Sequence, residues 1–146
     1  MNFNIELPKI NSPVANYKAY KIENNLLYIS GQTCRKDGQV IHRGKVGVDL
    51  NIDTAKQAAR LCGLNILANV KDALKGDFAK IKSCLRLNIY INCDAEFYDH
   101  AKVADGASDL MVEVFGEDGK HTRSSIGVYS LPSNSAIEID AIFALK

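Results

Sequence analysis

The sequence contains no tryptophan, only three prolines and almost no net charge. Its 18 lysines and arginines are scattered among 17 aspartates and glutamates, which gives a formal charge of +1 at pH 7. A surface that binds nucleic acid needs a basic patch or stripe, and this distribution contains none. The charge pattern therefore argues against nucleic acid as a partner.

Long apolar segments are also absent. No stretch approaches the ~18 consecutive apolar residues of a membrane-spanning helix. Residues 1–9 lack the basic and apolar parts of a secretion signal. We therefore expect a cytoplasmic protein that does not enter membranes.

Cysteine and histidine are few and widely spaced. No two cysteines form a C-x-x-C pair, and no histidine is at metal-ligand spacing from another histidine or from a cysteine. The residues are Cys34, Cys62, Cys84, Cys93, His42, His100 and His121. We expect reduced, mostly buried thiols and assign no metal.

The composition suits a globular protein. The chain has 146 residues, of which 47% are hydrophobic and 24% charged. This length can bury a core without disulfides or metals. We interpret residues 1–146 as one domain.

Period-two patterns predict three strands in the first two thirds of the chain. Residues 17–22 and 26–31 are rich in aromatic and branched side chains, and residues 23–25 between them suit a tight turn. Residues 84–93 alternate between apolar and polar side chains. The apolar set of this strand is Leu85, Leu87, Ile89 and Ile91, and the polar set is Arg86, Asn88, Tyr90 and Asn92.

Helical spacing of apolar residues predicts two helices. The first is capped by Asn51 or Asp53 and runs to about Leu74. The second is capped by Asp94 and ends at Gly116. Their apolar faces predict that both helices pack on a sheet.

Two more strands are predicted at residues 124–131 and 136–145, joined by a polar loop of hairpin length at residues 132–135. The order β-β-α-β-α-β-β predicts an α+β domain with two helices on one face of a mixed sheet. The open face is expected to be polar and covered by water or by other subunits. Its predicted residues are Arg86, Asn88, Tyr90, Arg123, Ser125, Tyr129, Glu138 and Asp140.

Three segments in order carry a resemblance to a known family. Residues 12–17 lead to Leu-Tyr-Ile-Ser-Gly-Gln at 27–32, residues 123–132 read Arg-Ser-Ser-Ile-Gly-Val-Tyr-Ser-Leu-Pro, and residues 137–141 read Ile-Glu-Ile-Asp-Ala. Together they resemble the RidA/YjgF family, also labelled endoribonuclease L-PSP. The combination spans most of the chain, and its departures from the usual motifs make it similar to a longer, less characterised branch.

The resemblance implies a chorismate-mutase-like fold and a homotrimer with ligand clefts between subunits. It also implies a deaminase that hydrolyses reactive enamines and imines, such as 2-aminoacrylate, to 2-keto acids and ammonia without a cofactor. Two other functions stay open. One is a non-catalytic protein that binds small carboxylates in the same cleft, and the other is an endoribonuclease or translation inhibitor, which the charge balance does not support.

Two residues are expected to be catalytic. The guanidinium of Arg123 is a permanently charged planar fork that matches a substrate carboxylate. The alternative is a salt bridge on the sheet. The carboxylate of Glu138 should emerge on the polar face, where it could orient or deprotonate the attacking water. The alternative is a solvated strand residue.

Four more residues complete the expected binding site. Ser30 and Gly31 can present backbone groups to a small ligand, and Tyr17 can cover the cleft or simply pack there. Ser125 lies two residues after Arg123, where many family members have cysteine, so thiol-dependent reactivity is excluded at this position. Gly127 stands where archetypal members often have glutamate.

A register argument separates the two expected catalytic residues. If the last two strands form a simple hairpin, Glu138 lies opposite about Val128. Arg123 is then roughly 16 Å away, at about 3.3 Å per residue. We therefore expect Arg123 and Glu138 of one site to come from different subunits.

Overall fold

The computed structural model describes residues 3–13 and 15–146. Residues 1–2, and Val14 within the first family motif, lie outside the described residues. Strand β1 (Tyr20–Glu23) pairs with β2 (Leu26–Thr33) in an antiparallel hairpin. Asn24 and Asn25 in the turn have φ values of 50° and 61°. Asparagine tolerates this left-handed region, so the predicted hairpin is confirmed.

Helix α1 (Ile52–Ala73) follows a second, short hairpin of β3 (Arg35–Lys36) and β4 (Gln39–Val40). The side chain of Asn51 accepts a hydrogen bond of 2.8 Å from the backbone N–H of Thr54. This is the N-cap that the sequence predicts, with Asn51 and not Asp53 as the capping residue.

Strand β5 (Ile81–Asn92) follows a short 3₁₀ turn at Phe78–Lys80 and alternates as predicted with one exception. Leu85 was expected to face the core, but its side chain is 38% exposed. The register of β5 against its neighbour shifts between Cys84 and Arg86, and this irregularity turns Leu85 outward.

Helix α2 (His100–Phe115) begins later than the sequence predicts. Asp94 does not cap it. Its carboxylate instead accepts the backbone N–H of Glu96 at 3.1 Å, in a turn that precedes the helix. The helix ends at Gly116, whose φ of 64° favours glycine, as predicted. A 3₁₀ turn at Gly116–Gly119 follows.

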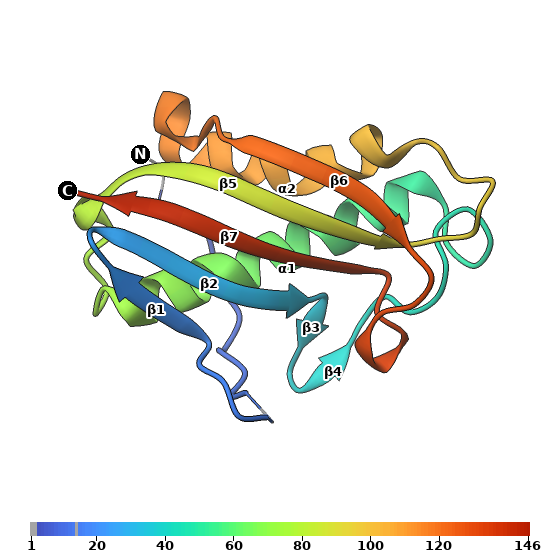
Figure 1. Cartoon of the computed structure of the whole chain (residues 1–146), viewed down its shortest axis with the longest axis horizontal. Coiled ribbons are helices and arrows are strands. Elements are labelled where there is room, and N and C mark those ends of the chain that lie inside the picture. Colours follow the sequence, from blue (N-terminus) through green and yellow to red (C-terminus); the bar gives the residue numbers. More distant parts are fainter. Residues whose placement is uncertain (1–2, 14) are drawn as a thin grey trace.

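The last two strands, β6 (Thr122–Val128) and β7 (Ile137–Leu145), do not form the predicted hairpin. A 3₁₀ turn at Pro132–Asn134 connects them, but the sheet order is β1-β2-β7-β5-β6. Strand β5 therefore lies between them, parallel to β6 and antiparallel to β7. The connection crosses over a strand and places β6 at the sheet edge (Figure 1).

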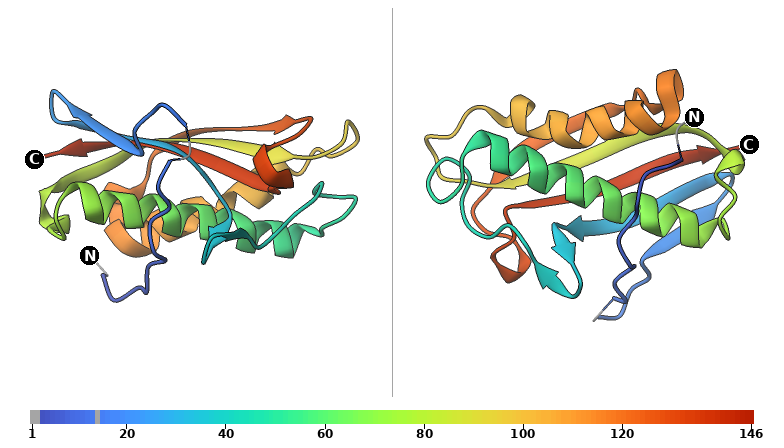
Figure 2. Two further views of the ribbon diagram at one scale, coloured as in Figure 1. Left: turned by 90° about the horizontal axis from the view of Figure 1, so that it is seen from below. Right: turned by 180° about the vertical axis from the view of Figure 1, so that it is seen from behind.

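The two helices cover one face of this sheet and leave the other open (Figure 2). The α+β class and the layer arrangement are confirmed. The core lies between the helices and the sheet; its largest fully buried side chains are Phe143, Leu27, Ile66, Leu67, Leu87, Ile89, Ile91, Leu110, Met111, Ile137, Ile139 and Val46. All four cysteines are buried and unpaired by disulfides, as expected. No helix in the described part of the chain is long and apolar enough to span a bilayer.

Candidate functional site

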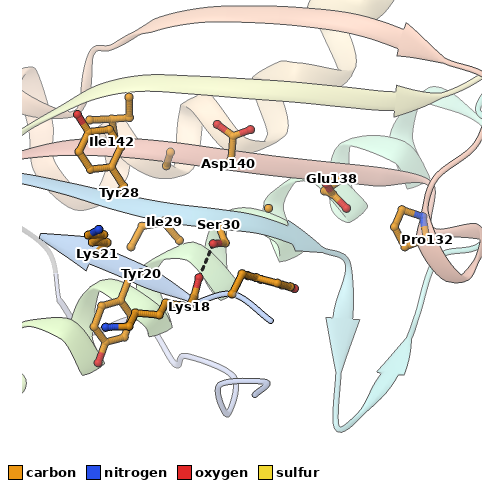
Figure 3. Close-up of a pocket in the computed structure, with 13 residues that line it drawn as sticks. Lys18, Tyr20, Lys21, Tyr28, Ile29, Ser30, Pro132, Glu138, Asp140 and Ile142 are labelled. Carbon is orange, nitrogen blue, oxygen red and sulfur yellow. Dashed lines mark hydrogen bonds between the residues drawn. The ribbon is translucent and has the colours of Figure 1, made fainter. Parts of the chain in front are cut away.

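Strand β2 is interrupted where it meets β7, and the interruption opens a site on the free face of the sheet. The pairing register shifts between Ile29 and Gln32, so Ser30 and Gly31 lie in a bulge. The hydroxyl of Ser30 donates to the carbonyl oxygen of Lys18 at 2.6 Å (Figure 3), and its backbone N–H donates to that of Ala19 at 2.9 Å. These bonds hold the segment before β1 against the bulge.

Gly31 makes room for a carboxylate. A Cβ atom at this position would lie 2.6 Å from Oε2 of Glu138 on the neighbouring strand β7. Such an approach is closer than van der Waals contact permits, so only glycine accommodates the observed position of Glu138. The bulge and the carboxylate therefore form one unit.

Glu138 is half-buried, and its side-chain carboxylate makes no hydrogen bond or ion pair with any other described residue. Burial, and then the neighbouring carboxylate of Asp140, raise the pKa of Glu138 above its ordinary value. A carboxylate with a raised pKa and free oxygens is better suited to accept and return a proton than an ordinary surface carboxylate.

Asp140, in contrast, is fully engaged on the same face. Its two oxygens accept hydrogen bonds from Asn88 at 2.7 Å and from the hydroxyl of Tyr90 at 3.2 Å. Arg86 in turn donates to Asn88 at 3.0 Å. This network holds the carboxylate of Asp140 in position beside Glu138, whereas the carboxylate of Glu138 has no hydrogen-bond partner among the described residues.

Two adjoining cavities meet at Glu138. The first, of about 560 Å³, extends along β1, β2 and β7 (Figure 3). The second, of about 490 Å³, extends toward the N-terminal segment and the β3–β4 hairpin. Both are lined by Tyr17, Gly31, Pro132 and Glu138, and Ser30 lines the first. The structure thus brings together four of the six residues selected from the sequence.

Arg123 is not among them, because it lies on the opposite face of the sheet. In β6 it pairs with Leu87, which is fully buried beneath the helices. Its guanidinium forms an ion pair of 2.8 Å with Asp105 of α2 and donates to Ser108 at 3.0 Å and to the carbonyl oxygen of Ala101 at 3.3 Å. The prediction that Arg123 shares the open face with Glu138 is wrong.

Ser125 faces the helices as well, since it pairs with the buried Ile89. Its predicted position on the open face is therefore also wrong. Gly127, two residues further, explains one departure from the family pattern. A Cβ there would lie 2.7 Å from the sulfur of Cys93 and 3.0 Å from Nε2 of His100, so a glutamate would not fit without rearrangement.

The separation of Arg123 from Glu138 within one chain was predicted correctly, but for a different reason. The sequence argument used a hairpin register that does not exist. The structure separates the two side chains because they occupy opposite faces and nonadjacent strands of the sheet. One chain by itself does not bring them into one cleft.

A serine and a histidine that the sequence patterns did not single out support Arg123. His121 Nδ1 lies 2.7 Å from the carbonyl oxygen of Gly119, which can only accept, so Nδ1 carries the proton. Burial lowers the pKa of His121 and favours its neutral form. Its Nε2 then accepts the hydroxyl of Ser108 at 2.9 Å, and this orients the Ser108 oxygen toward Arg123.

Arg35 also lines the second cavity, and the sequence patterns did not single it out either. The signal available was the Asp-Gly dipeptide at 37–38, which favours a two-residue turn. Asp37 and Gly38 have φ values of 52° and 79° and close the β3–β4 hairpin beside the cavity. Within the described residues, no cluster of three or more His, Cys, Asp or Glu side chains could hold a metal ion.

This arrangement, two helices on one face of a mixed sheet with a bulge and a carboxylate on the other, is that of the chorismate-mutase-like proteins. Residues 1–144 match the family described as "YjgF/chorismate mutase-like, putative endoribonuclease". The chain belongs to the YjgF family, which includes the RidA proteins.

Individual relatives match nearly the whole chain. Protein TCP17 of Trypanosoma cruzi is 37% identical over 97% of this chain and 89% of its own length. A Dermatophagoides farinae protein named 2-iminobutanoate/2-iminopropanoate deaminase is 26% identical over 97% of this chain and 95% of its own. The crystal structure of the protein Atu1372 from Agrobacterium tumefaciens superimposes with a TM-score of 0.92 at 42% identity, covering 98% of this chain and 87% of that one.

Proposed function

We propose that this chain is a cytoplasmic, cofactor-free hydrolase that converts small 2-imino acids and their enamine tautomers to 2-keto acids and ammonia. The main support for this proposal is the carboxylate of Glu138, which lies where two cavities meet. It is half-buried, has a raised pKa and has no hydrogen-bond partner among the described residues. Membership of the YjgF family and the deaminase name of the Dermatophagoides farinae relative support the proposal.

The reaction requires a positioned water molecule and one side chain that accepts and then donates a proton. The enamine 2-aminoacrylate is protonated at its terminal carbon and becomes the iminium of a 2-imino acid. Glu138 accepts a proton from water as the water oxygen bonds to the iminium carbon, and this forms a carbinolamine. Glu138 then returns the proton to the nitrogen. The C–N bond breaks as the carbinolamine hydroxyl loses its proton, which passes to the departing ammonia, so that a keto acid and ammonium are released. Because the iminium is already a good electrophile, placing the water contributes more than basicity does.

In this proposal, the substrate carboxylate is bound by Arg123 of a neighbouring subunit in a homotrimer. Nε and one hydrogen of Nη2 of Arg123 make no bond to other described residues, so a carboxylate can approach without displacing Asp105. Arg123 also lies at the edge of the subunit, because β6 is the outermost strand on one side of the sheet. Tyr17, Ser30 and Gly31 of the chain that supplies Glu138 complete the pocket, and Ser125, on the same strand face as Arg123, is proposed to contact the substrate beside it.

The open face favours such an assembly. Apolar side chains lie beside the polar network on this face, among them Tyr28, Ile126 and Ile142. Tyr28 and Ile126 are 42% and 49% exposed in the single chain. A second copy that packs against this face would bury these side chains and bring an edge strand toward Glu138.

The direct test couples the chain to a pyridoxal-phosphate dehydratase that releases 2-aminoacrylate from serine. Free enamine and imine are trapped by semicarbazide, so a hydrolase reduces the amount of semicarbazone and accelerates keto acid release. We expect this effect when the protein is present at a much lower concentration than the imine. Glu138→Gln should lower the rate of imine hydrolysis by about 10²-fold or more. Saturable binding of a small carboxylate without any acceleration would contradict the hydrolase and favour the non-catalytic binding protein.

A further inference from the structure

The second cavity beside Glu138 has a single positive charge. Among the described residues that line it, Arg35 is the only cation and Glu138 is the only carboxylate. Arg35 comes from the short strand β3, and Glu138 comes from β7. Unlike Arg123, Arg35 therefore shares a cavity with Glu138 within one chain.

Arg35 is held in place at both ends. Its backbone carbonyl accepts a hydrogen bond of 2.8 Å from Asn65, a side chain of α1 that is 2% exposed. Its guanidinium donates to the carbonyl oxygen of Gly38 at 2.9 Å and to the hydroxyl of Ser133 at 3.5 Å. A guanidinium fixed in this way loses little further entropy when it binds an anion.

The charge of Arg35 has no ion-pair partner among residues 3–13 and 15–146. No carboxylate of the described residues lies within ion-pair distance of it, and both of its hydrogen-bond acceptors are neutral. Arg123, in contrast, is already neutralised by Asp105. The two arginines therefore differ in what they offer, because Arg35 presents an uncompensated charge to a cavity.

The geometry points to Arg35 as the binding residue for a second acidic group of the substrate, so that dicarboxylic 2-imino acids are the preferred substrate class. The inference rests on the proposed imine hydrolysis, in which Arg123 of a neighbouring subunit takes the first carboxylate. A dianionic substrate would be repelled by Glu138, and Arg35 offsets that repulsion. A cavity of about 490 Å³ also exceeds what a three-carbon acid fills.

The test compares two imines under one assay. An L-aspartate oxidase generates iminosuccinate, a dicarboxylic imine, and an L-amino acid oxidase generates a monocarboxylic imine from alanine, each with semicarbazide as the trap. We expect kcat/KM for iminosuccinate to exceed that for the monocarboxylic imine by about tenfold or more. Arg35→Gln should lower this ratio by at least about tenfold.

The matched control is Lys36→Gln, which removes the same charge from the same strand at a residue that does not line either cavity. This variant should keep the wild-type ratio. If Arg35 only braces the β3–β4 turn, Arg35→Gln lowers both kcat/KM values together and the ratio stays unchanged. That result would overturn the inference, as would a wild-type preference for the monocarboxylic imine.

A failure of the proposed function is recognised separately. If neither imine is hydrolysed, succinate and propionate are titrated against the chain by calorimetry. Succinate binding that Arg35→Gln weakens by about tenfold, with Lys36→Gln unchanged, supports Arg35 as the residue for a second acidic group. Equal affinity of the wild-type chain for succinate and propionate, or the absence of succinate binding, contradicts it.

Discussion

The burial of Glu138 suits its carboxylate for proton transfer, but it also lowers the free energy of unfolding when the carboxylate is charged. Its pKa is raised above an ordinary value of 4.5, first by burial and then by Asp140. The folded chain therefore binds more protons than the unfolded chain between pH 4.5 and the raised pKa. The free energy of unfolding falls as pH rises through this window, and the loss is complete above it.

Glu138→Gln should consequently be more stable than the wild-type chain at neutral pH. Glutamine has nearly the same shape and no charge to desolvate, so the gain should vanish below about pH 4.5, where the carboxyl is protonated in both states. Urea denaturation at neutral pH and at about pH 4 measures this difference. Equal stability of the two proteins at neutral pH would show that the burial of the charge costs nothing.

Gly31→Ala should separate activity from stability. The added Cβ meets Oε2 of Glu138 at 2.6 Å, and this atom is the end of a side chain that can rotate away. We expect the free energy of unfolding to change by less than about 1 kcal/mol while kcat falls by about tenfold or more, because the carboxylate leaves its position. Retained kcat with the alanine in place would mean that the position of Glu138 does not matter.

Single residues show what alternation in a sequence can and cannot predict. Alternation within β7 placed Glu138 and Asp140 on the same face, opposite Ile137 and Ile139, because buried and exposed residues differ clearly there. In β6, Arg123 and Ser125 were predicted on the open face, yet Arg123 faces the helices and the apolar Ile126 is 49% exposed. The open side of this edge strand carries the polar Thr122 and Ser124 as well as Ile126, so the strand has no apolar face that alternation could identify.

At the scale of elements, the helices and strands follow from local signals, but their pairing does not. The asparagine turn, the Asn51 cap and the glycine at the end of α2 are encoded within a few residues. The loop between β6 and β7 has hairpin length, although β5 separates the two strands. Only the whole sheet shows that β7 pairs with β2 and β5, since those contacts join distant segments.

Helices α1 and α2 pack so closely at Gly106 that replacing this glycine by alanine should destabilise the fold, which is the opposite of the usual effect within a helix. Alanine in place of glycine within a helix usually stabilises by roughly 0.5–1 kcal/mol. A Cβ on Gly106, however, would lie 2.1 Å from the backbone carbonyl oxygen of Lys56. We expect Gly106→Ala to destabilise the chain by about 1–3 kcal/mol, because the helices must move apart.

Urea denaturation of Gly106→Ala checks this expectation, with Asp109→Ala as the control. Asp109 lies on the exposed side of the same helix, so its replacement tests helix propensity without the close contact. The control should change the free energy of unfolding by less than about 0.5 kcal/mol. A stabilising Gly106→Ala would show that the helix contact is looser than the structure indicates.

At the scale of the whole molecule, the open sheet face predicts association. Ile126→Asp should weaken it, because a charge would be buried between copies at a position that is 49% exposed in the single chain. Sedimentation velocity should show a trimer for the wild-type chain and smaller species for the variant. An unchanged mass for Ile126→Asp would place the subunit contact elsewhere.

The central claim is that a working site needs Glu138 from one chain and Arg123 from the next. Glu138→Gln and Arg123→Ala, each inactive alone, are unfolded together in equal amounts and refolded, and imine hydrolysis is then measured. Random mixing around a ring leaves about one quarter of the sites intact, so about one quarter of the wild-type activity should return. Activity no higher than that of either variant alone would contradict a site shared between subunits.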